Sequence, residues 1–269
     1  MRKLLTTMVL AALTVAATAQ TKIIAHRGHW QTEGSAQNSL TSLRKAAEIG
    51  CWGSECDIWI TTDGVCVINH DADIKGIVIE KARYADLRDI KLANGEPLPT
   101  LEQYLWQAVQ NPNTRLIVEV KSHVSKDAER KCIDEMLRLV KKYGAVDQTD
   151  YISFSLNACE YIVEQAPKVL NGPNGQRSGK REDKVNLCVE YLSGDLSPEE
   201  VKAKGITGID YHKDVLLKKH PEWIDECHKL GLTVNVWTVD DLNEMWTLIQ
   251  KKVDKITTNR PVEALKLSR

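Results

Sequence analysis

The sequence predicts an α/β fold in which eight parallel strands, each followed by a helix, close into a barrel. Short apolar, strand-like runs alternate along the chain with segments whose apolar residues recur at helical spacing. Eight such units fit a closed barrel, and the roughly 250 residues after the N-terminal segment are typical of one barrel domain. The predicted strands are residues 23–26, 54–60, 115–121, 151–155, 185–191, 207–211, 232–237 and 254–258.

Residues 1–19 are expected to be a cleavable export signal. Two basic residues precede an apolar run, 4–16, that is too short to cross a bilayer, and the Ala-Thr-Ala that follows is typical of a cleavage site. We therefore expect one domain over residues 20–269. The protein is expected to be secreted across the inner membrane, to the periplasm or the exterior.

Charge and cysteine content exclude several classes of function. A formal net charge of −1 gives no electrostatic reason to bind nucleic acid or an anionic membrane surface. No later apolar run is long enough for stable membrane insertion. The seven cysteines lack the paired spacing of a zinc site, and an odd number excludes complete pairing within one chain. A small-molecule substrate is the expected partner.

The candidate site residues begin in the first two strands. His26 and Arg27 lie where the first strand runs out into a loop. Glu55 and Asp57 are two apart on a strand, so both side chains point to one face. Two carboxylates this close repel each other, and a bound cation is the usual reason that such a pair is tolerated. The pattern indicates a metal-assisted phosphate site.

A hairpin is predicted to bring a second histidine to these carboxylates. Asp63-Gly64 between two strand-like runs is a strong signal for a tight turn. The return run, 65–70, cannot be a parallel barrel strand, because a parallel crossover needs about a dozen residues or more. It is therefore expected to be an added antiparallel strand. If Thr61 pairs with Val65, the register places His70 opposite Cys56.

The third strand offers another acid and base. In residues 115–121, Glu119 and Lys121 share one face with Ile117. Alone, such a pair can be a plain structural ion pair. The helices are predicted at residues 39–49, 85–90, 100–110, 126–143, 157–166, 197–203, 221–230 and 241–249.

The glycine-rich run 171–184 could be mistaken for a phosphate-binding loop. It follows a helix and leads into a strand, and in a barrel such loops lie on the non-catalytic face. Its content of glycine, asparagine and charged residues is typical of an exposed loop. We expect it to have no part in the site.

Taken in order, the motifs resemble the glycerophosphodiester phosphodiesterase family in its secreted bacterial type. They are Ile-Ala-His-Arg-Gly, Asn38-Ser39, the Glu-x-Asp, Thr-x-Asp-Gly and His-Asp motifs of the hairpin, Glu-x-Lys at 119–121, and Val-Trp-Thr at 236–238. The resemblance implies a TIM-type (β/α)8 barrel that hydrolyses glycerophosphodiesters to glycerol 3-phosphate and an alcohol. A phospholipase C/D-like or sugar phosphodiesterase activity on the same site, and a non-catalytic phosphodiester-binding protein, are the alternatives.

The resemblance also implies roles for individual residues. Glu55, Asp57 and Glu119 match the metal ligands, and their carboxylates favour one divalent cation, Ca²⁺ or Mg²⁺, over zinc. His26 and His70 match the acid/base pair. The phosphate and substrate contacts match Arg27, Lys121, Asn38 and Trp237.

This chain departs from the family's pattern at two places. The family commonly has Pro-Glu-Asn before Ser39, where this chain has Ala36-Gln37-Asn38. A Thr-Asp-Arg-Pro pattern near the C-terminus appears here as Thr258-Asn259-Arg260-Pro261. Neither change touches the three matched ligands, but the first removes an acidic group near the expected site.

Overall fold

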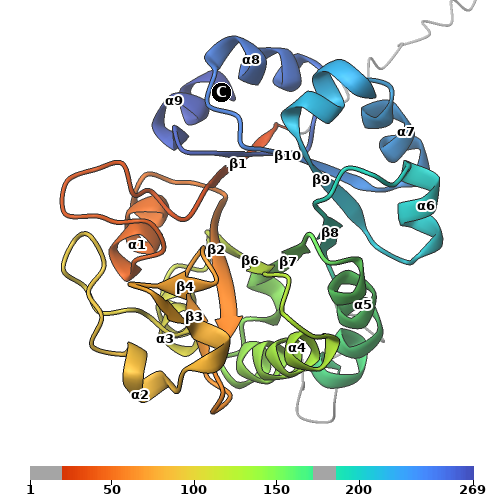
Figure 1. Cartoon of the computed structure of the whole chain (residues 1–269). Helices are drawn as coiled ribbons and strands as arrows, with labels where there is room; N and C mark the ends of the chain where they lie inside the picture. The colour runs from red at the N-terminus through yellow and green to blue at the C-terminus, as the bar shows by residue number, and fades with distance from the viewer. Residues whose placement is uncertain (1–19, 172–185) are drawn as a thin grey trace, which may run out of the picture.

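The computed structural model describes residues 20–171 and 186–269. The predicted export signal and nearly all of the glycine-rich run lie outside the described residues. Eight parallel strands form a closed TIM-type barrel with helices around it, as predicted (Figure 1). In barrel order they are β1 (Lys22–Ala25), β2 (Gly53–Ile60), β6 (Arg115–Val120), β7 (Thr149–Ser153), β8 (Val189–Tyr191), β9 (Gly208–His212), β10 (Thr233–Trp237) and β11 (Lys255–Thr258).

The short first strand both closes the barrel and leaves room for the hairpin. All of β1 pairs with β11, but only its end pairs with β2, where Ala25 lies opposite Ser54. The rest of that edge of β2 is free, and β3 (Cys66–Ile68) pairs there in antiparallel fashion, with Ile58 opposite Ile68. The predicted added strand is confirmed. It lies at the end of the barrel where the parallel strands finish.

Several of the helices begin at a side chain that caps the first turn. Ser39, Thr100 and Ser125 each accept a hydrogen bond from a backbone N–H in the first turn of the helix that follows. The helices are α1 (Leu40–Glu48), α2 (Tyr84–Leu87), α3 (Leu101–Ala108), α4 (Lys126–Lys142), α5 (Leu156–Leu170), α6 (Pro198–Ala203), α7 (Trp223–Leu230), α8 (Leu242–Gln250) and α9 (Pro261–Leu267).

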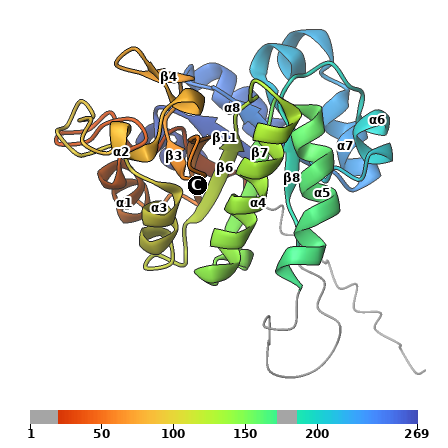
Figure 2. The same ribbon diagram turned by 60° about the horizontal axis from the view of Figure 1, so that its bottom comes forward.

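Some elements were not predicted. They include α9, a π-helical turn at Val215–Lys219, and a small antiparallel sheet of β4 (Asp73–Ile74) and β5 (Ile77–Val78). Figure 2 shows β4 standing at the end of the molecule opposite the C-terminal end of α5. No helix of the described residues is long and apolar enough to cross a membrane.

Side-chain alternation divides each strand between two environments. Cys56, Ile58 and Val118 are buried in the large core between the strands and the helices. The opposite face points into the barrel, where Ile24 and Ile117 belong to a small apolar cluster. The barrel interior therefore has little apolar volume, and much of the rest is polar.

The seven cysteine thiols are all free, and six of them are buried. Cys132 and Cys227 are fully buried in helices, as expected for small apolar side chains. Burial raises the pKa of Cys51 and Cys227 to about 12, so these thiols stay protonated and unreactive at neutral pH.

Charged side chains fill the barrel interior near the N-terminal ends of the strands. The Lys255 ammonium lies 2.7 Å from Glu190 Oε1 and 3.6 Å from Asp150 Oδ2. Asp210, which is 1% exposed, has no well-formed hydrogen bond to either carboxyl oxygen within the described residues. Burial, followed by the charge of Glu190, raises its pKa well above the ordinary value.

Asp210→Asn is expected to stabilise the protein above neutral pH, because a proton that only the folded state retains costs about 1.4 kcal/mol for each pH unit above the ordinary pKa of the carboxyl. The folded state retains a proton on Asp210 that the unfolded state releases above about pH 4, so this residue lowers stability as pH rises. An amide cannot ionise. Unfolding in denaturant should show a gain at pH 8 that shrinks toward pH 4, and a variant less stable than wild type at pH 8 would contradict this account.

Candidate active site

Three buried carboxylates meet where β2 and β6 approach the mouth of the barrel. Asp57 and Glu119 are direct neighbours in the sheet, and Glu55 is two residues earlier on the same face of β2. One oxygen from each lies within 4.8 Å of the others. Their exposed fractions are 2% for Glu55, 1% for Asp57 and 8% for Glu119, so water screens their mutual repulsion poorly.

The loop after β1 wraps over Glu55. The backbone N–H of Arg27 donates to Glu55 Oε2 at 2.7 Å. Arg27 has φ 56° and Gly28 has φ 79°, both left-handed. A Cβ on Gly28 would lie 2.3 Å from Ser42 Oγ and 2.6 Å from the backbone carbon of Ser42. Only glycine fits at position 28 of this turn, and the turn directs the Arg27 N–H toward the Glu55 carboxylate.

Two positively charged side chains and one amide side chain contact the other two carboxylates, Asp57 and Glu119. The Lys121 ammonium lies 2.7 Å from Glu119 Oε1 and 3.2 Å from Asp57 Oδ1. Arg27 Nε is 3.8 Å from Asp57 Oδ2, and Asn38 Nδ2 donates to the same oxygen at 2.8 Å. Asn38 is itself buried, and its contact with substrate stays a prediction.

The surroundings of the three carboxyl groups shift their pKa values in different directions. Burial, together with the charges of Asp57 and Glu119, raises the pKa of Glu55 well above its usual range. Burial and the charge of Asp57 raise the pKa of Glu119 to about 7. Burial also opposes ionisation of Asp57, but Lys121 and the hydrogen bond from Asn38 outweigh it and lower the pKa. Three acids against two cationic side chains leave negative charge uncompensated.

These residues fit a hard divalent cation. Glu55 Oε1 is buried and has no hydrogen-bond partner among the described residues. The donors are carboxylate oxygens, the ligands that Ca²⁺ and Mg²⁺ prefer. A cation here would compensate the excess negative charge and would displace the protons that burial favours on Glu55 and Glu119.

Two histidines flank the carboxylates. His26 Nε2 lies 4.0 Å from Glu55 Oε2, and burial, reinforced by the Arg27 charge, lowers the pKa of His26 to about 4. His70 is delivered by the hairpin, since the N–H of Asn69 donates to the Asp57 carbonyl at 3.1 Å. The His70 Nδ1 lies 2.7 Å from Asp71 Oδ1. The predicted register of the hairpin is confirmed.

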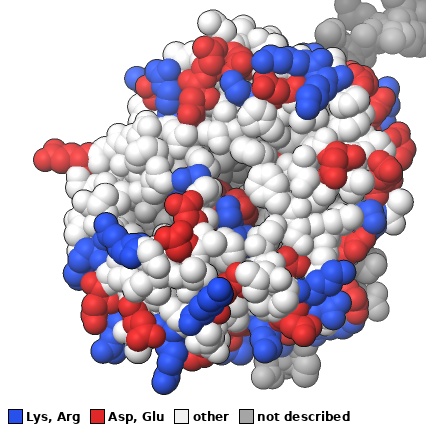
Figure 3. Space-filling model, viewed as in Figure 1, with Lys and Arg blue, Asp and Glu red and all other residues white. Residues whose placement is uncertain are grey.

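Trp237 ends β10 at the same mouth. Its Nε1–H donates to the Asp210 carbonyl at 2.9 Å, which fixes the ring. Phe154 and His212 approach the indole edge-on, with ring centroids 5.3 and 5.2 Å away. Figure 3 shows a hollow at the centre of this face, with acidic and basic side chains gathered in it and uncharged atoms around much of its rim.

The family model for the glycerophosphoryl diester phosphodiesterase family matches residues 26–263. The chain belongs to this family. A solved glycerophosphodiester phosphodiesterase from Parabacteroides distasonis is 45% identical, covers 93% of this chain and 98% of that chain, and has a TM-score of 0.85.

More distant relatives match this chain over nearly its whole length. A glycerophosphodiester phosphodiesterase of Caldanaerobacter subterraneus is 23% identical over 93% of this chain and 98% of its own length. A phosphodiesterase from Oleispira antarctica was solved in complex with the product sn-glycerol-3-phosphate; it is 20% identical, covers 92% of this chain and 96% of that chain, and has a TM-score of 0.74.

In this family member, the residues of the predicted motifs lie together around the three carboxylates. Sequence reasoning missed three others. Asn259 Oδ1 lies 2.9 Å from His26 Nδ1, Asp240 accepts from the Asn259 amide, and Trp59 Nε1 donates to the His70 carbonyl at 3.3 Å. Only the position of Asn259 carried a signal, as a departure from the family's Thr-Asp-Arg-Pro.

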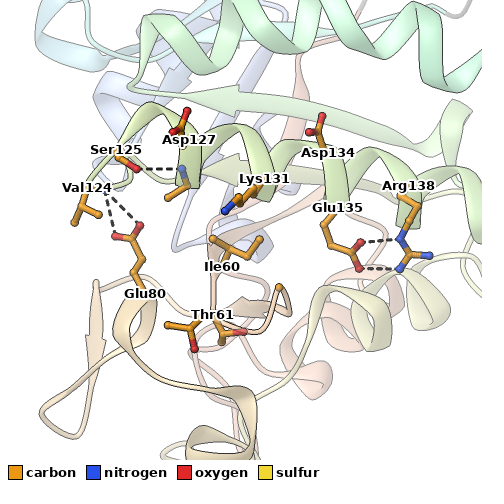
Figure 4. Close-up of a pocket in the computed structure, with 13 residues that line it drawn as sticks. Ile60, Thr61, Glu80, Val124, Ser125, Asp127, Lys131, Asp134, Glu135 and Arg138 are labelled. Atoms are coloured by element: carbon orange, nitrogen blue, oxygen red, sulfur yellow. Dashed lines mark hydrogen bonds and ion pairs between the residues drawn. The ribbon is translucent and has the colours of Figure 1, made fainter.

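A separate groove lies outside this site. It has a volume of about 520 Å³ and runs between the hairpin turn and α4 (Figure 4). Glu80 crosses one end and accepts from the Val124 N–H, while Glu135 pairs with Arg138 at the other. None of the predicted site residues lines it.

Proposed function

We propose that this family member hydrolyses glycerophosphodiesters to glycerol 3-phosphate and an alcohol with the help of one divalent cation, Ca²⁺ or Mg²⁺. The observation that carries the proposal is the cluster of Glu55, Asp57 and Glu119 at the barrel mouth, with ligand oxygens within 4.8 Å of one another. The Parabacteroides relative, 45% identical over nearly the whole chain, supports the reaction class.

The three carboxylates would hold the cation. When bound, it would supply Lewis-acid polarisation of a phosphoryl oxygen. Arg27 and Lys121 would bring positive charge to the phosphate, since Arg27 is 3.8 Å from Asp57 and Lys121 is 3.2 Å from it. Such fixed charges stabilise negative charge that grows during the reaction without having to reorganise.

His26 and His70 would handle the protons. One takes a proton from the attacking water or substrate hydroxyl, and the other gives one to the leaving alcohol. Attack by a neighbouring substrate hydroxyl would produce a cyclic phosphate before glycerol 3-phosphate. We also propose export to the periplasm or the exterior, on the basis of the signal pattern in residues 1–19.

A lipid substrate has less support. The apolar cluster after the hairpin would have to face a membrane or micelle, but Ile74 is 9% exposed and Ile79 is fully buried. Of the four apolar residues of this cluster, Ile77 and Val78, at 37% and 38%, are open to solvent. The exposed apolar surface of these two residues is small compared with the apolar patches that mark membrane-binding surfaces.

The test compares glycerophosphocholine with a micellar phosphatidylcholine of the same head group. The product is identified by an assay specific for glycerol 3-phosphate. We expect release from glycerophosphocholine and little turnover of the intact lipid. Faster turnover of the lipid, or release of phosphocholine in place of glycerol 3-phosphate, would replace the proposal with a phospholipase. Binding without turnover would point to the non-catalytic alternative.

A further inference from the structure

We propose that Asn259 is a positioning residue that holds the ring proton of His26 on Nδ1, so that Nε2 faces the carboxylates as a proton acceptor. The assignment of His26 as the base rests on the proposed function. The position of the ring proton does not, and it can be measured separately.

Asn259 stands between a histidine, an indole and a carboxylate. Its Oδ1 lies 2.9 Å from His26 Nδ1 and accepts from Trp30 Nε1 at 3.1 Å. Its Nδ2 donates to Asp240 Oδ2 at 2.9 Å. Asn259 follows β11, Asp240 follows β10 and His26 follows β1, which are three neighbouring strands of the barrel.

The surroundings determine which way the Asn259 amide points. An indole N–H can only donate, and an ionised carboxylate can only accept. A turned amide would set Nδ2 against the Trp30 N–H and Oδ1 against Asp240. It would lose both hydrogen bonds and leave four polar groups badly paired. The oxygen of Asn259 therefore faces His26.

Asp240 is itself held in place as an acceptor. Its Oδ1 accepts from the Asn259 backbone N–H at 2.8 Å and from the Thr258 hydroxyl at 3.0 Å. Both donors come from the chain that carries the amide. The carboxylate and the amide thus form a rigid unit at the ends of two adjacent strands.

This arrangement selects one tautomer of His26. Because the Asn259 oxygen accepts, Nδ1 must carry the proton, and a neutral ring then has its lone pair on Nε2. Nε2 lies 4.0 Å from Glu55 Oε2, on the side of the carboxylates. As the new O–P bond forms, Nε2 takes the proton of the attacking hydroxyl. His70 is left to protonate the leaving oxygen as the old P–O bond breaks.

The chain's own departure from the family pattern gives this unit its form. Where the family commonly has an aspartate before Arg-Pro, this chain has the amide of Asn259 with the carboxylate of Asp240 behind it. The amide orients the ring by hydrogen bonding alone and places no full negative charge against Nδ1. The same polar groups in exchanged order should therefore orient His26 as well.

The experiment uses the protein of residues 20–269 with Mg²⁺ or Ca²⁺ and compares wild type, Asn259→Leu, and the exchange Asp240→Asn/Asn259→Asp. Leucine keeps the size of the side chain without an acceptor. In the exchange, the amide at position 240 donates to the carboxylate at position 259, so an acceptor faces His26 again. The measurements are ¹⁵N NMR of the His26 ring, kcat and KM for glycerophosphocholine, and thermal unfolding.

We expect a protonated Nδ1 and an unprotonated Nε2 in wild type. Asn259→Leu should lose this single tautomer and about 10²-fold in kcat with little change in KM, as misplaced catalytic groups do. The exchange should recover both. If wild type lacks turnover but shows the Nδ1–H tautomer, the proposed function fails and the orientation stands.

Protonation on Nε2 in wild type would overturn the inference, and so would unchanged kcat in a folded Asn259→Leu. Should Asn259→Leu not fold, the wild-type spectrum and the exchange variant decide. An exchange variant that folds but does not restore the tautomer would also refute it.

Discussion

Asp57→Asn is expected to reduce kcat/KM for glycerophosphodiesters on the order of 10³-fold, at or above the usual cost of removing one group that stabilises the transition state. Asp57 is the carboxylate on which Lys121, Arg27 and Asn38 converge. The substitution keeps its size but removes a charge, so we expect weaker cation binding and a loosened phosphate site. Calorimetric titration with Mg²⁺ or Ca²⁺ and a steady-state assay measure the two effects.

Glu48→Gln provides the control for Asp57→Asn. Glu48 is a half-exposed carboxylate on α1 that pairs with Arg44, remote from the cluster. It should bind cation and turn over substrate like wild type. If Asp57→Asn kept both wild-type cation affinity and wild-type turnover, Asp57 would not be a ligand, and the cluster would be only structural.

His70→Ala is expected to reduce turnover by about 10²–10⁴-fold while cation and substrate still bind, the usual range for a general acid or base. The hairpin register places this histidine beside β2, and Asp71 holds its Nδ1 at 2.7 Å. Its loss should therefore lower kcat far more than it changes KM. The measurement is steady-state kinetics on glycerophosphocholine.

His220 offers a matched control for His70. The two side chains are 43% and 41% exposed, and each has a carboxylate at Nδ1, Glu222 for His220. His220 stacks on Trp223 away from the barrel mouth. His220→Ala should keep full turnover. Equal turnover in the two variants would mean that the hairpin does not place His70 in the reaction.

Local pattern was enough to predict the parts of the fold that repeat. Alternation along a strand correctly places Glu55 and Asp57 on the inner face with Cys56 on the other. The Asp-Gly turn and its register correctly return the chain past Asp57. Each of these features depends on neighbours within about ten residues, which a sequence displays directly.

Other features depend on partners distant in sequence. The amide of Asn38 donates to Asp57, 19 residues away, a contact that its own motif does not indicate. The amide of Asn259 meets His26 across 233 residues, which no local pattern indicates. The two-residue strands β4 and β5 are too short to show a period, and the partners of Asp210 inside the barrel depend on closure of all eight strands.

The most direct test of the central claim is cation dependence. The protein is stripped with a chelator, and Mg²⁺ or Ca²⁺ is then titrated back while release of glycerol 3-phosphate from glycerophosphocholine is followed. We expect negligible activity in the stripped protein and recovery that saturates at one cation per chain, with no recovery in Asp57→Asn. Full activity in verified cation-free protein would contradict a catalytic role for a cation held by Glu55, Asp57 and Glu119.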